Sequence, residues 1–320
     1  MTDRRTLTFD SHGTACEAWH LRAAHDDLAT AAGRPVVVLA HGLGGTKDSG
    51  LLPFAEGFAA AGLDALLFDY RGFGGSAGTP RQVVSLADQL EDYRAAMRAA
   101  AALPGVDPRR LVLWGVSLAG GHVLAAAAGR DDVAAVVSVV PLVDGLAAGR
   151  LALESHSAGQ LLRSTAVGLR SRAARLSGRE PRMMPIVARP GELGALTLPG
   201  CYEDYLSIAG PTWRNEIAAD VSLELGTREP SKRAADVRCP VLVQIADFDR
   251  SAPPYAAAKA AFRARAEVRH YPCDHFDLFP GKRWHEPAVA HATSFLSRHL
   301  SPRASEAPPV IEPAPETARV

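Results

Sequence analysis

Trp114-Gly115-Val116-Ser117-Leu118-Ala119-Gly120-Gly121 stands where an apolar segment gives way to an alanine-rich one. The apolar residues 111–116 predict a buried strand, and residues 118–128 predict a helix. A serine on such a sharp strand-to-helix turn needs small residues two positions before and after it, because larger ones would clash. Gly115 meets that need and Ala119 fills the second position. Ser117 is therefore a candidate nucleophile, and the alternative is an ordinary serine helix cap.

Strands and helices alternate on both sides of this turn. Continuous apolar runs, typical of strands buried on both faces of a parallel sheet, are separated by helical patterns. This alternation predicts an α/β fold with a mostly parallel central sheet and helices on both faces. The expected strands are 6–9 and 16–22, which form a hairpin, then 35–40, 63–70, 111–116, 133–140, 239–246 and 267–272, and the expected helices are 51–61, 81–102, 118–128, 254–265 and 284–299.

The connection 145–235 is far longer than the few residues that usually join neighbouring elements of such a sheet. It contains helix-like pieces around the Pro/Gly-rich stretch PRMMPIVARPGELGALTLPG. We interpret it as a helical cap inserted into an α/β core made of residues 1–144 and 236–300. The segment 301–320 is rich in Pro, Ala and Glu and has no period, so it is expected to be disordered.

Composition narrows the class of protein. The chain has 320 residues, 47% of them apolar, and 35 basic residues balance 35 acidic ones. This length suffices for a sizeable core, and the charge balance does not indicate a nucleic-acid or membrane-surface binder. The sequence shows no secretory signal and no apolar run long enough for a membrane span.

Four cysteines are spread along the chain without a C-x-x-C pair, which argues against a metal site or a disulfide framework. They are Cys16, Cys201, Cys239 and Cys273. A reducing cytoplasm is the simplest expectation, and one disulfide between two cysteines that meet in space is the alternative.

Two further strings give the chain a family resemblance. His41-Gly42-Leu43-Gly44-Gly45 follows the strand 35–40, and DYRGFGGS at 69–76 follows the next one. With the Ser117 turn, in this order, they resemble the α/β-hydrolase superfamily over about residues 35–300, the cap excepted. The glycines lack the spacing of a phosphate-binding loop. The resemblance implies an oxyanion hole made by the backbone N–H groups of Leu43 and Leu118, whereas His41 is expected to hold the loop in place.

The resemblance also implies an acid and a base, in the chain order Ser, Asp or Glu, His. Asp249 stands four residues before Pro253 in the loop after the strand 239–246, where the family carries its acid. Asp247 and Asp144 are the competing candidates. His275 follows the strand 267–272 and is the expected general base.

A serine nucleophile excludes the branches of this family that use aspartate and favours hydrolysis of a small-molecule carboxylic ester or thioester, with no cofactor or metal. An acyltransferase and a catalytically inactive binding module are the alternatives. Met183, Met184 and Trp213 are expected either to bind the acyl group or to pack the cap. Seven cap arginines are expected to form a solvated face, or else to bind an acidic substrate: Arg150, Arg163, Arg170, Arg172, Arg175, Arg179 and Arg182.

Overall fold

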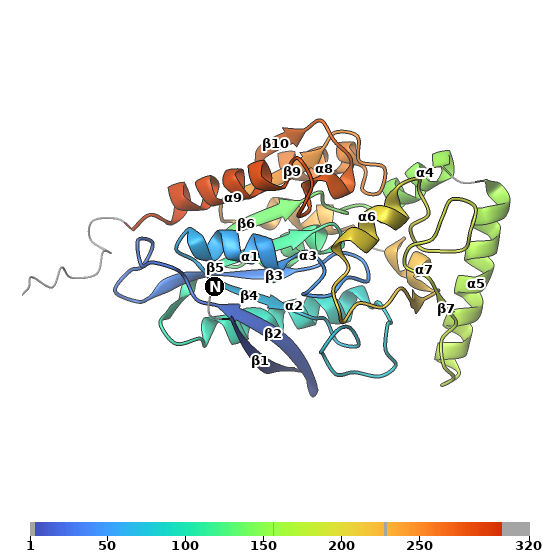
Figure 1. The fold of residues 1–320 in the computed structure, drawn as a ribbon, viewed down its shortest axis with the longest axis horizontal. Coiled ribbons are helices and arrows are strands. Elements are labelled where there is room, and N and C mark those ends of the chain that lie inside the picture. The colour runs from blue at the N-terminus through green and yellow to red at the C-terminus, as the bar shows by residue number, and fades with distance from the viewer. Residues whose placement is uncertain (1–3, 156, 227–228, 303–320) are drawn as a thin grey trace, which may run out of the picture.

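The computed structural model describes residues 4–155, 157–226 and 229–302. Its main sheet has eight strands in the order β1-β2-β4-β3-β5-β6-β9-β10 (Figure 1). The first two strands pair antiparallel, as do β2 and β4, and the other pairs are parallel. The strands are β1 (Arg4–Ser11), β2 (Thr14–Leu21), β3 (Arg34–Ala40), β4 (Asp64–Phe68), β5 (Val106–Val116), β6 (Val133–Val139), β9 (Val241–Ala246) and β10 (Glu267–Tyr271). The predicted fold class is confirmed.

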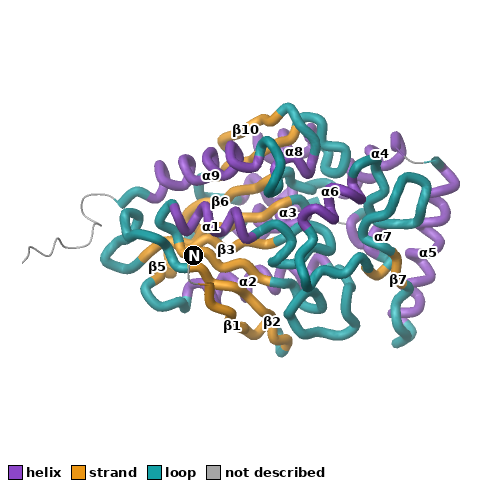
Figure 2. The backbone as a smooth tube through the Cα atoms, viewed as in Figure 1, coloured by secondary structure: helices purple, strands orange, loops and turns teal. Residues whose placement is uncertain are grey.

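Helices cover both faces of the sheet. Figures 1 and 2 show α1 and α9 in front of it and α2, α3 and α8 behind it. Every residue of β3, β4 and β9 is buried, as the continuous apolar runs predicted for strands covered on both sides. The bounds are α1 (Leu52–Ala60), α2 (Leu86–Ala101), α3 (Leu118–Ala127), α8 (Pro254–Arg263) and α9 (His285–Leu300).

One helix begins later than the sequence predicted. The apolar spacing favoured a helix from residue 81, but α2 begins at Leu86. Gln82 has a φ of 60°, which a right-handed helix excludes, and Ser85 caps α2 by accepting a hydrogen bond from the Asp88 N–H at 3.3 Å. Val83 therefore lies in a loop, and the periodicity extends into it by coincidence.

The long connection between β6 and β9 contributes its own helices and a small two-stranded sheet. Most of these elements lie together at one end of the main sheet, on the right in Figure 1, whereas the 3₁₀ helix η1 (Pro230–Asp236) packs against α3 and α8. The elements of the connection are α4 (Gly145–Ser155), α5 (Ala158–Leu176), β7 (Met183–Met184), α6 (Cys201–Ile208), β8 (Ile217–Ala218), α7 (Val221–Leu225) and η1.

Three expectations concern the ends of the chain, membranes and cysteines. Most of the tail 301–320 lies outside the described residues. Within 4–155, 157–226 and 229–302, no helix combines the length and the apolar character that crossing a bilayer requires. All four cysteines fall within the described residues, and all four are free thiols.

Candidate active site

Ser117 occupies the turn between β5 and α3 in an unusual backbone conformation. Its φ is 58° and its ψ is −117°, a region that costs a non-glycine residue on the order of 1–3 kcal/mol. Two backbone hydrogen bonds hold it there: the Ser117 N–H donates to Val139 O, and the Leu142 N–H donates to Ser117 O, both at 2.9 Å. This strained turn presents the Ser117 side chain to the cavity described below.

The glycines around Ser117 are required by close backbone approaches. A Cβ on Gly115 would lie 2.2 Å from Ala119 O, and a Cβ on Gly120 would lie 2.9 Å from the Cα of Pro141. Ala119 has room for its methyl group and is completely buried. Because Gly120 makes the close approach on the helix side, alanine is tolerated where the family pattern has glycine.

The loop after β3 brings its backbone against Ser117. A Cβ on Gly42 would lie 3.3 Å from Ser117 Oγ. Within the described residues, the backbone N–H groups of Leu43 and Leu118 donate no hydrogen bond. Both residues are buried, and Leu43 lines the same cavity as Ser117. An unpaired buried N–H is costly, so these two donors are available to a bound oxygen atom.

Buried polar contacts hold the loop after β3 in place. Lys47 is completely buried, and its Nζ lies 2.5 Å from Asp69 Oδ2 and 2.7 Å from Glu17 Oε1. The Lys47 N–H donates to Asp69 Oδ1 at 2.6 Å. On the cavity side, Tyr205 Oη donates to Leu43 O at 2.7 Å. The carbonyl of Leu43 is thereby turned toward α6.

His275 and Asp249 form a buried pair. The loop after β10 carries His275, the loop after β9 carries Asp249, and these strands are neighbours in the sheet. His275 Nδ1 donates to Asp249 Oδ2 at 2.6 Å. The other carboxylate oxygen accepts the N–H groups of Ser251 and Ala252 at 2.8 and 2.7 Å. These bonds orient the carboxylate and leave Nε2 as the free nitrogen of the ring.

Burial and charge act in opposite directions on His275. Burial disfavours the imidazolium and by itself would lower the pKa of His275. The negative charge of Asp249, its hydrogen bond to the ring and the charge of Asp274 together outweigh burial, so the pKa of His275 is raised above its ordinary value. The pair therefore stabilises the protonated ring.

The two competing acids make other contacts. Asp247 Oδ1 lies 2.6 Å from Nδ1 of His270, at the protein surface. Asp144 Oδ1 accepts the Ala147 N–H at 2.9 Å, at the start of α4. Of the three aspartates, Asp249 is the one bonded to His275.

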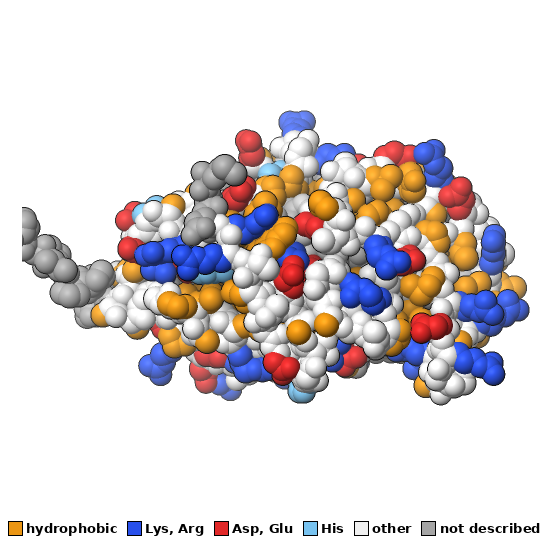
Figure 3. Space-filling model, turned by 60° about the horizontal axis from the view of Figure 1, so that its bottom comes forward, with side chains coloured by type: hydrophobic (Ala, Val, Ile, Leu, Met, Phe, Trp, Pro, Cys, Tyr) orange, Lys and Arg blue, Asp and Glu red, His pale blue; other side chains and the backbone are white. Residues whose placement is uncertain are grey.

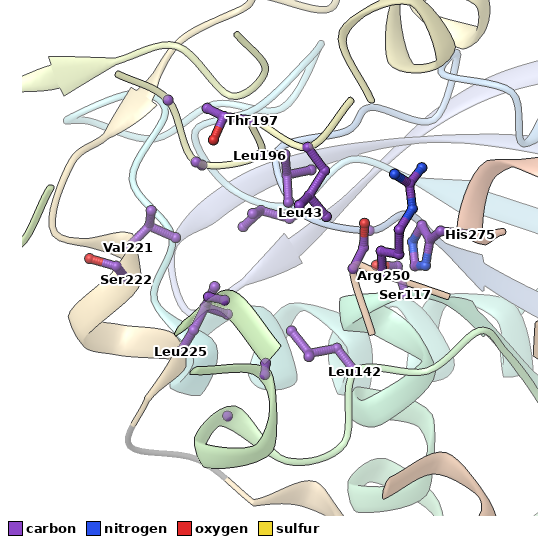
Figure 4. A pocket seen from close by; sticks show the side chains of 18 of the residues that line it. Leu43, Ser117, Leu142, Leu196, Thr197, Val221, Ser222, Leu225, Arg250 and His275 are labelled. Carbon is purple, nitrogen blue, oxygen red and sulfur yellow. The ribbon is translucent and has the colours of Figure 1, made fainter. Parts of the chain in front are cut away.

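Ser117 and His275 both line a cavity of about 650 Å³. Figure 4 shows Ser117, His275 and Arg250 together at one end, with Val221, Ser222 and Leu225 at the other. Leucines supply much of the wall, and no aspartate or glutamate among the described residues lines it. The leucines are Leu43, Leu142, Leu146, Leu153, Leu161, Leu196, Leu198 and Leu225.

Arg250 was not predicted from the sequence, although it follows Asp249 directly. Its Nε donates to Asp274 Oδ2 at 2.6 Å and its Nη2 donates to Pro199 O at 3.1 Å. The guanidinium group is thus fixed beside the Ser117 end of the cavity. Its position next to Asp249 was the only indication in the sequence that Arg250 belongs to the site. The direction of a side chain in a loop cannot be predicted from sequence.

Of the three residues that the sequence suggested for substrate binding, only one lines the cavity. Met184 is buried and lines the cavity, whereas Met183 and Trp213 do not line it. Met183 and Met184 are consecutive on β7, so their side chains point to opposite faces. Trp213 stacks on the ring of Tyr205 with 5.1 Å between centroids, and so supports the side chain that holds Leu43.

His41 holds the loop, as expected, although it also lines the cavity. Burial is the main influence that lowers the pKa of His41. The neutral ring donates its Nδ1–H to Gly42 O at 2.9 Å and packs edge-on against Tyr70, with 4.9 Å between ring centroids.

Comparison with known proteins decides the family. A sequence model of the alpha/beta hydrolase fold matches residues 35–282. The chain belongs to the alpha/beta hydrolase family. A quorum-quenching protein, AidA, of Acinetobacter baumannii (strain MDR-ZJ06) is 35% identical over 295 residues, which cover 91% of this chain and 94% of that protein.

Two further relatives of this hydrolase are fungal. The thiohydrolase aneE of Aspergillus aculeatus is 34% identical over 157 residues, 49% of each chain. The crystal structure of the alpha/beta hydrolase GrgF from Penicillium sp. sh18 superposes with a TM-score of 0.76 at 24% identity, covering 93% of this chain and 99% of that one. The structural likeness confirms the fold.

Proposed function

We propose that this hydrolase cleaves a carboxylic ester or thioester through an acyl-enzyme formed on Ser117. One observation carries the proposal: the strained Ser117 turn and the His275–Asp249 pair meet at one end of a largely apolar cavity. A nucleophile, a base and a group that orients the base are the parts that acyl transfer requires. In this proposal Ser117 attacks, His275 is the base and Asp249 orients it.

The proposed reaction has two steps. His275 Nε2 takes the Ser117 proton as Oγ attacks the carbonyl carbon, and the Leu43 and Leu118 N–H groups stabilise the oxyanion. The imidazolium then protonates the leaving alcohol or thiol. In the second step water attacks the acyl-enzyme and His275 takes a proton from it. As the bond between Ser117 Oγ and the acyl carbon breaks, His275 returns this proton to Oγ, and the free acid leaves. Each oxyanion donor is worth roughly 3–4 kcal/mol in such enzymes.

We further propose that residues 145–235 act as a cap on a core of residues 1–144 and 236–300. Leu146 and Leu153 of α4, Leu161 of α5 and Leu225 of α7 line the cavity. All the proposed reacting groups lie outside this segment. The cap would therefore bind the acyl group and exclude water, with Met184 among its contacts. The name of the relative aneE, a thiohydrolase, is in keeping with a thioester substrate.

An acyltransferase is the second candidate, because the relative grgF of Penicillium sp., 32% identical over 162 residues, is named a polyketide transferase. Purified protein should be tested on p-nitrophenyl esters and acyl thioesters of graded chain length. We expect stoichiometric release of free acid. A product that forms only when an alcohol or amine is added would favour the transferase. No turnover and no reaction with a fluorophosphonate would favour a binding module.

The raised pKa of His275 predicts the pH dependence of hydrolysis. His275 must be neutral to accept the Ser117 proton, so kcat/KM should rise with pH through one ionisation above the ordinary histidine value of about 6.5. The measurement is a pH profile of kcat/KM on an ester whose chemistry limits the rate. A rate that does not change between about pH 5 and 9 would contradict a histidine base.

Narrowing the far end of the cavity should shorten the preferred acyl chain. Leu225 is half-buried and lies across the cavity from Ser117 (Figure 4). For Leu225→Trp we expect kcat/KM to fall about tenfold or more on decanoate, while acetate changes by less than about twofold. The matched control is Leu206→Trp, because Leu206 is exposed on α6 and does not line the cavity. An equal loss on both esters would argue against acyl binding there.

A further inference from the structure

Helices α4 and α5 expose leucines that would normally be buried. Among the described residues, six leucines are strongly exposed, and five of them lie on these two helices. They are Leu146, Leu153, Leu162, Leu169 and Leu176, with exposed fractions of 56, 64, 72, 55 and 79%. Exposed apolar residues gathered in one place mark a binding surface more often than scattered ones do.

The leucines of α5 form one stripe. Leu162, Leu169 and Leu176 are seven residues apart, which is close to two helical turns. The opposite face of α5 is anchored: Gly168 packs against Ala219 O, and Ser171 Oγ donates to Asp220 Oδ1 at 3.2 Å. The stripe is therefore held outward by the packing of α5 and is not left exposed by fraying.

Arginines flank this stripe. Helix α5 has no acidic residue and contains Arg163, Arg170, Arg172 and Arg175. Arg175 pairs with Asp220, whereas within the described ranges the other three form no ion pair. Figure 3 shows basic and apolar side chains interspersed at this end of the molecule. A leucine stripe beside unpaired arginines is typical of a helix that lies in the interface of an anionic membrane.

The same surface adjoins the cavity. Leu146, Leu153 and Arg150 of α4 are exposed and also line the cavity wall, so the cavity reaches the surface at α4. A second copy of the chain would fit this surface poorly, because pairing α5 with itself would bring its unpaired arginines together. An anionic lipid surface complements both the leucines and the charge.

We propose that α4 and α5 dock this hydrolase on an anionic lipid surface, with the leucine stripe among the acyl chains and the arginines on the headgroups. Docking places the opening of the cavity at the lipid, where apolar substrates concentrate. The proposal concerns binding and holds whether or not the reaction at Ser117 is the one proposed above.

Flotation of the full chain with vesicles tests this docking. We expect binding to phosphatidylcholine vesicles that contain phosphatidylglycerol, weak binding to phosphatidylcholine alone, and weaker binding at high salt. Replacing Arg163, Arg170 and Arg172 by Gln should weaken binding on the order of a hundredfold, at about 1 kcal/mol for each charge. Replacing Leu162, Leu169 and Leu176 by Ser should weaken it at least about tenfold.

The matched control replaces Arg22, Arg98 and Arg109 by Gln. This control removes the same charge from exposed residues outside α4 and α5 and should bind as the original chain does. Equal loss in the control would show a nonspecific charge effect and overturn the proposal. Binding that neither α5 variant weakens would also overturn it. So would an absence of vesicle binding together with a dimer that the leucine variant dissociates, because the occupant would then be a second copy.

Discussion

Ser117→Ala is expected to reduce kcat on a p-nitrophenyl ester by about 10⁶ and to abolish covalent labelling by a fluorophosphonate. The proposed mechanism has no substitute for Oγ, because an acyl group must be attached to it between the two steps. The oxyanion donors would remain and would still stabilise attack by water, so a small residual rate is expected. Steady-state kinetics and intact-protein mass measure the two effects.

Ser251→Ala is the matched control for this experiment. Ser251 lines the same cavity, and its N–H supports Asp249, a bond that the substitution retains. This variant should still be labelled at one serine. Thermal unfolding of Ser117→Ala should be close to that of the original chain, because alanine at φ 58° is strained much as serine is. One stoichiometric label on Ser117→Ala would assign the nucleophile elsewhere.

Local patterns predicted the fold because they report backbone requirements. Gly115 and Gly120 stand where a Cβ would collide with the backbone, so the glycine spacing around Ser117 reflects a real steric limit. The continuous apolar run at 35–40 reflects a strand covered on both faces. Apolar periodicity wrongly predicted that α2 begins at residue 81. Val83 matches the apolar spacing of the helix but lies outside it.

The cavity could not be predicted in the same way. Its wall combines leucines from α4, α5 and α7 with loops that follow β3 and β9. Which side chains face it depends on how these elements pack, as Met183 and Met184 show on opposite faces of β7. The arginines of α5 were evident in the sequence, but their position beside exposed leucines depends on how α5 packs, and the overall charge balance does not report it.

The identity of the acid was left open by the sequence, since Asp144, Asp247 and Asp249 all follow strands at the same sheet edge. Side-chain direction separates them: Asp249 bonds His275, Asp247 faces His270, and Asp144 begins α4. This geometry makes Asp249 the candidate whose charge acts on the base.

Asp249→Asn is therefore expected to lower kcat on the order of 10⁴. An amide keeps the size of the side chain but can donate to Nδ1, which favours the tautomer with its proton on Nε2, where Ser117 needs an acceptor. The substitution also removes a negative charge that raises the pKa of His275, so this pKa should fall below its value in the original chain. A pH profile of kcat/KM for the variant measures this second effect.

The control for Asp249→Asn is Asp247→Asn, which removes the same charge two residues away and leaves the His275 bond in place. Asp247 is partly exposed and paired with His270, so solvent screens its charge, and we expect a change in kcat of less than about threefold. Merely structural support by Asp249 would lower kcat without moving the pH profile. The opposite ranking of the two variants would make Asp247 the acid. Small losses of kcat in both variants would make Asp144 the next candidate for the acid, because the bond between Asp249 and His275 would then contribute little to catalysis.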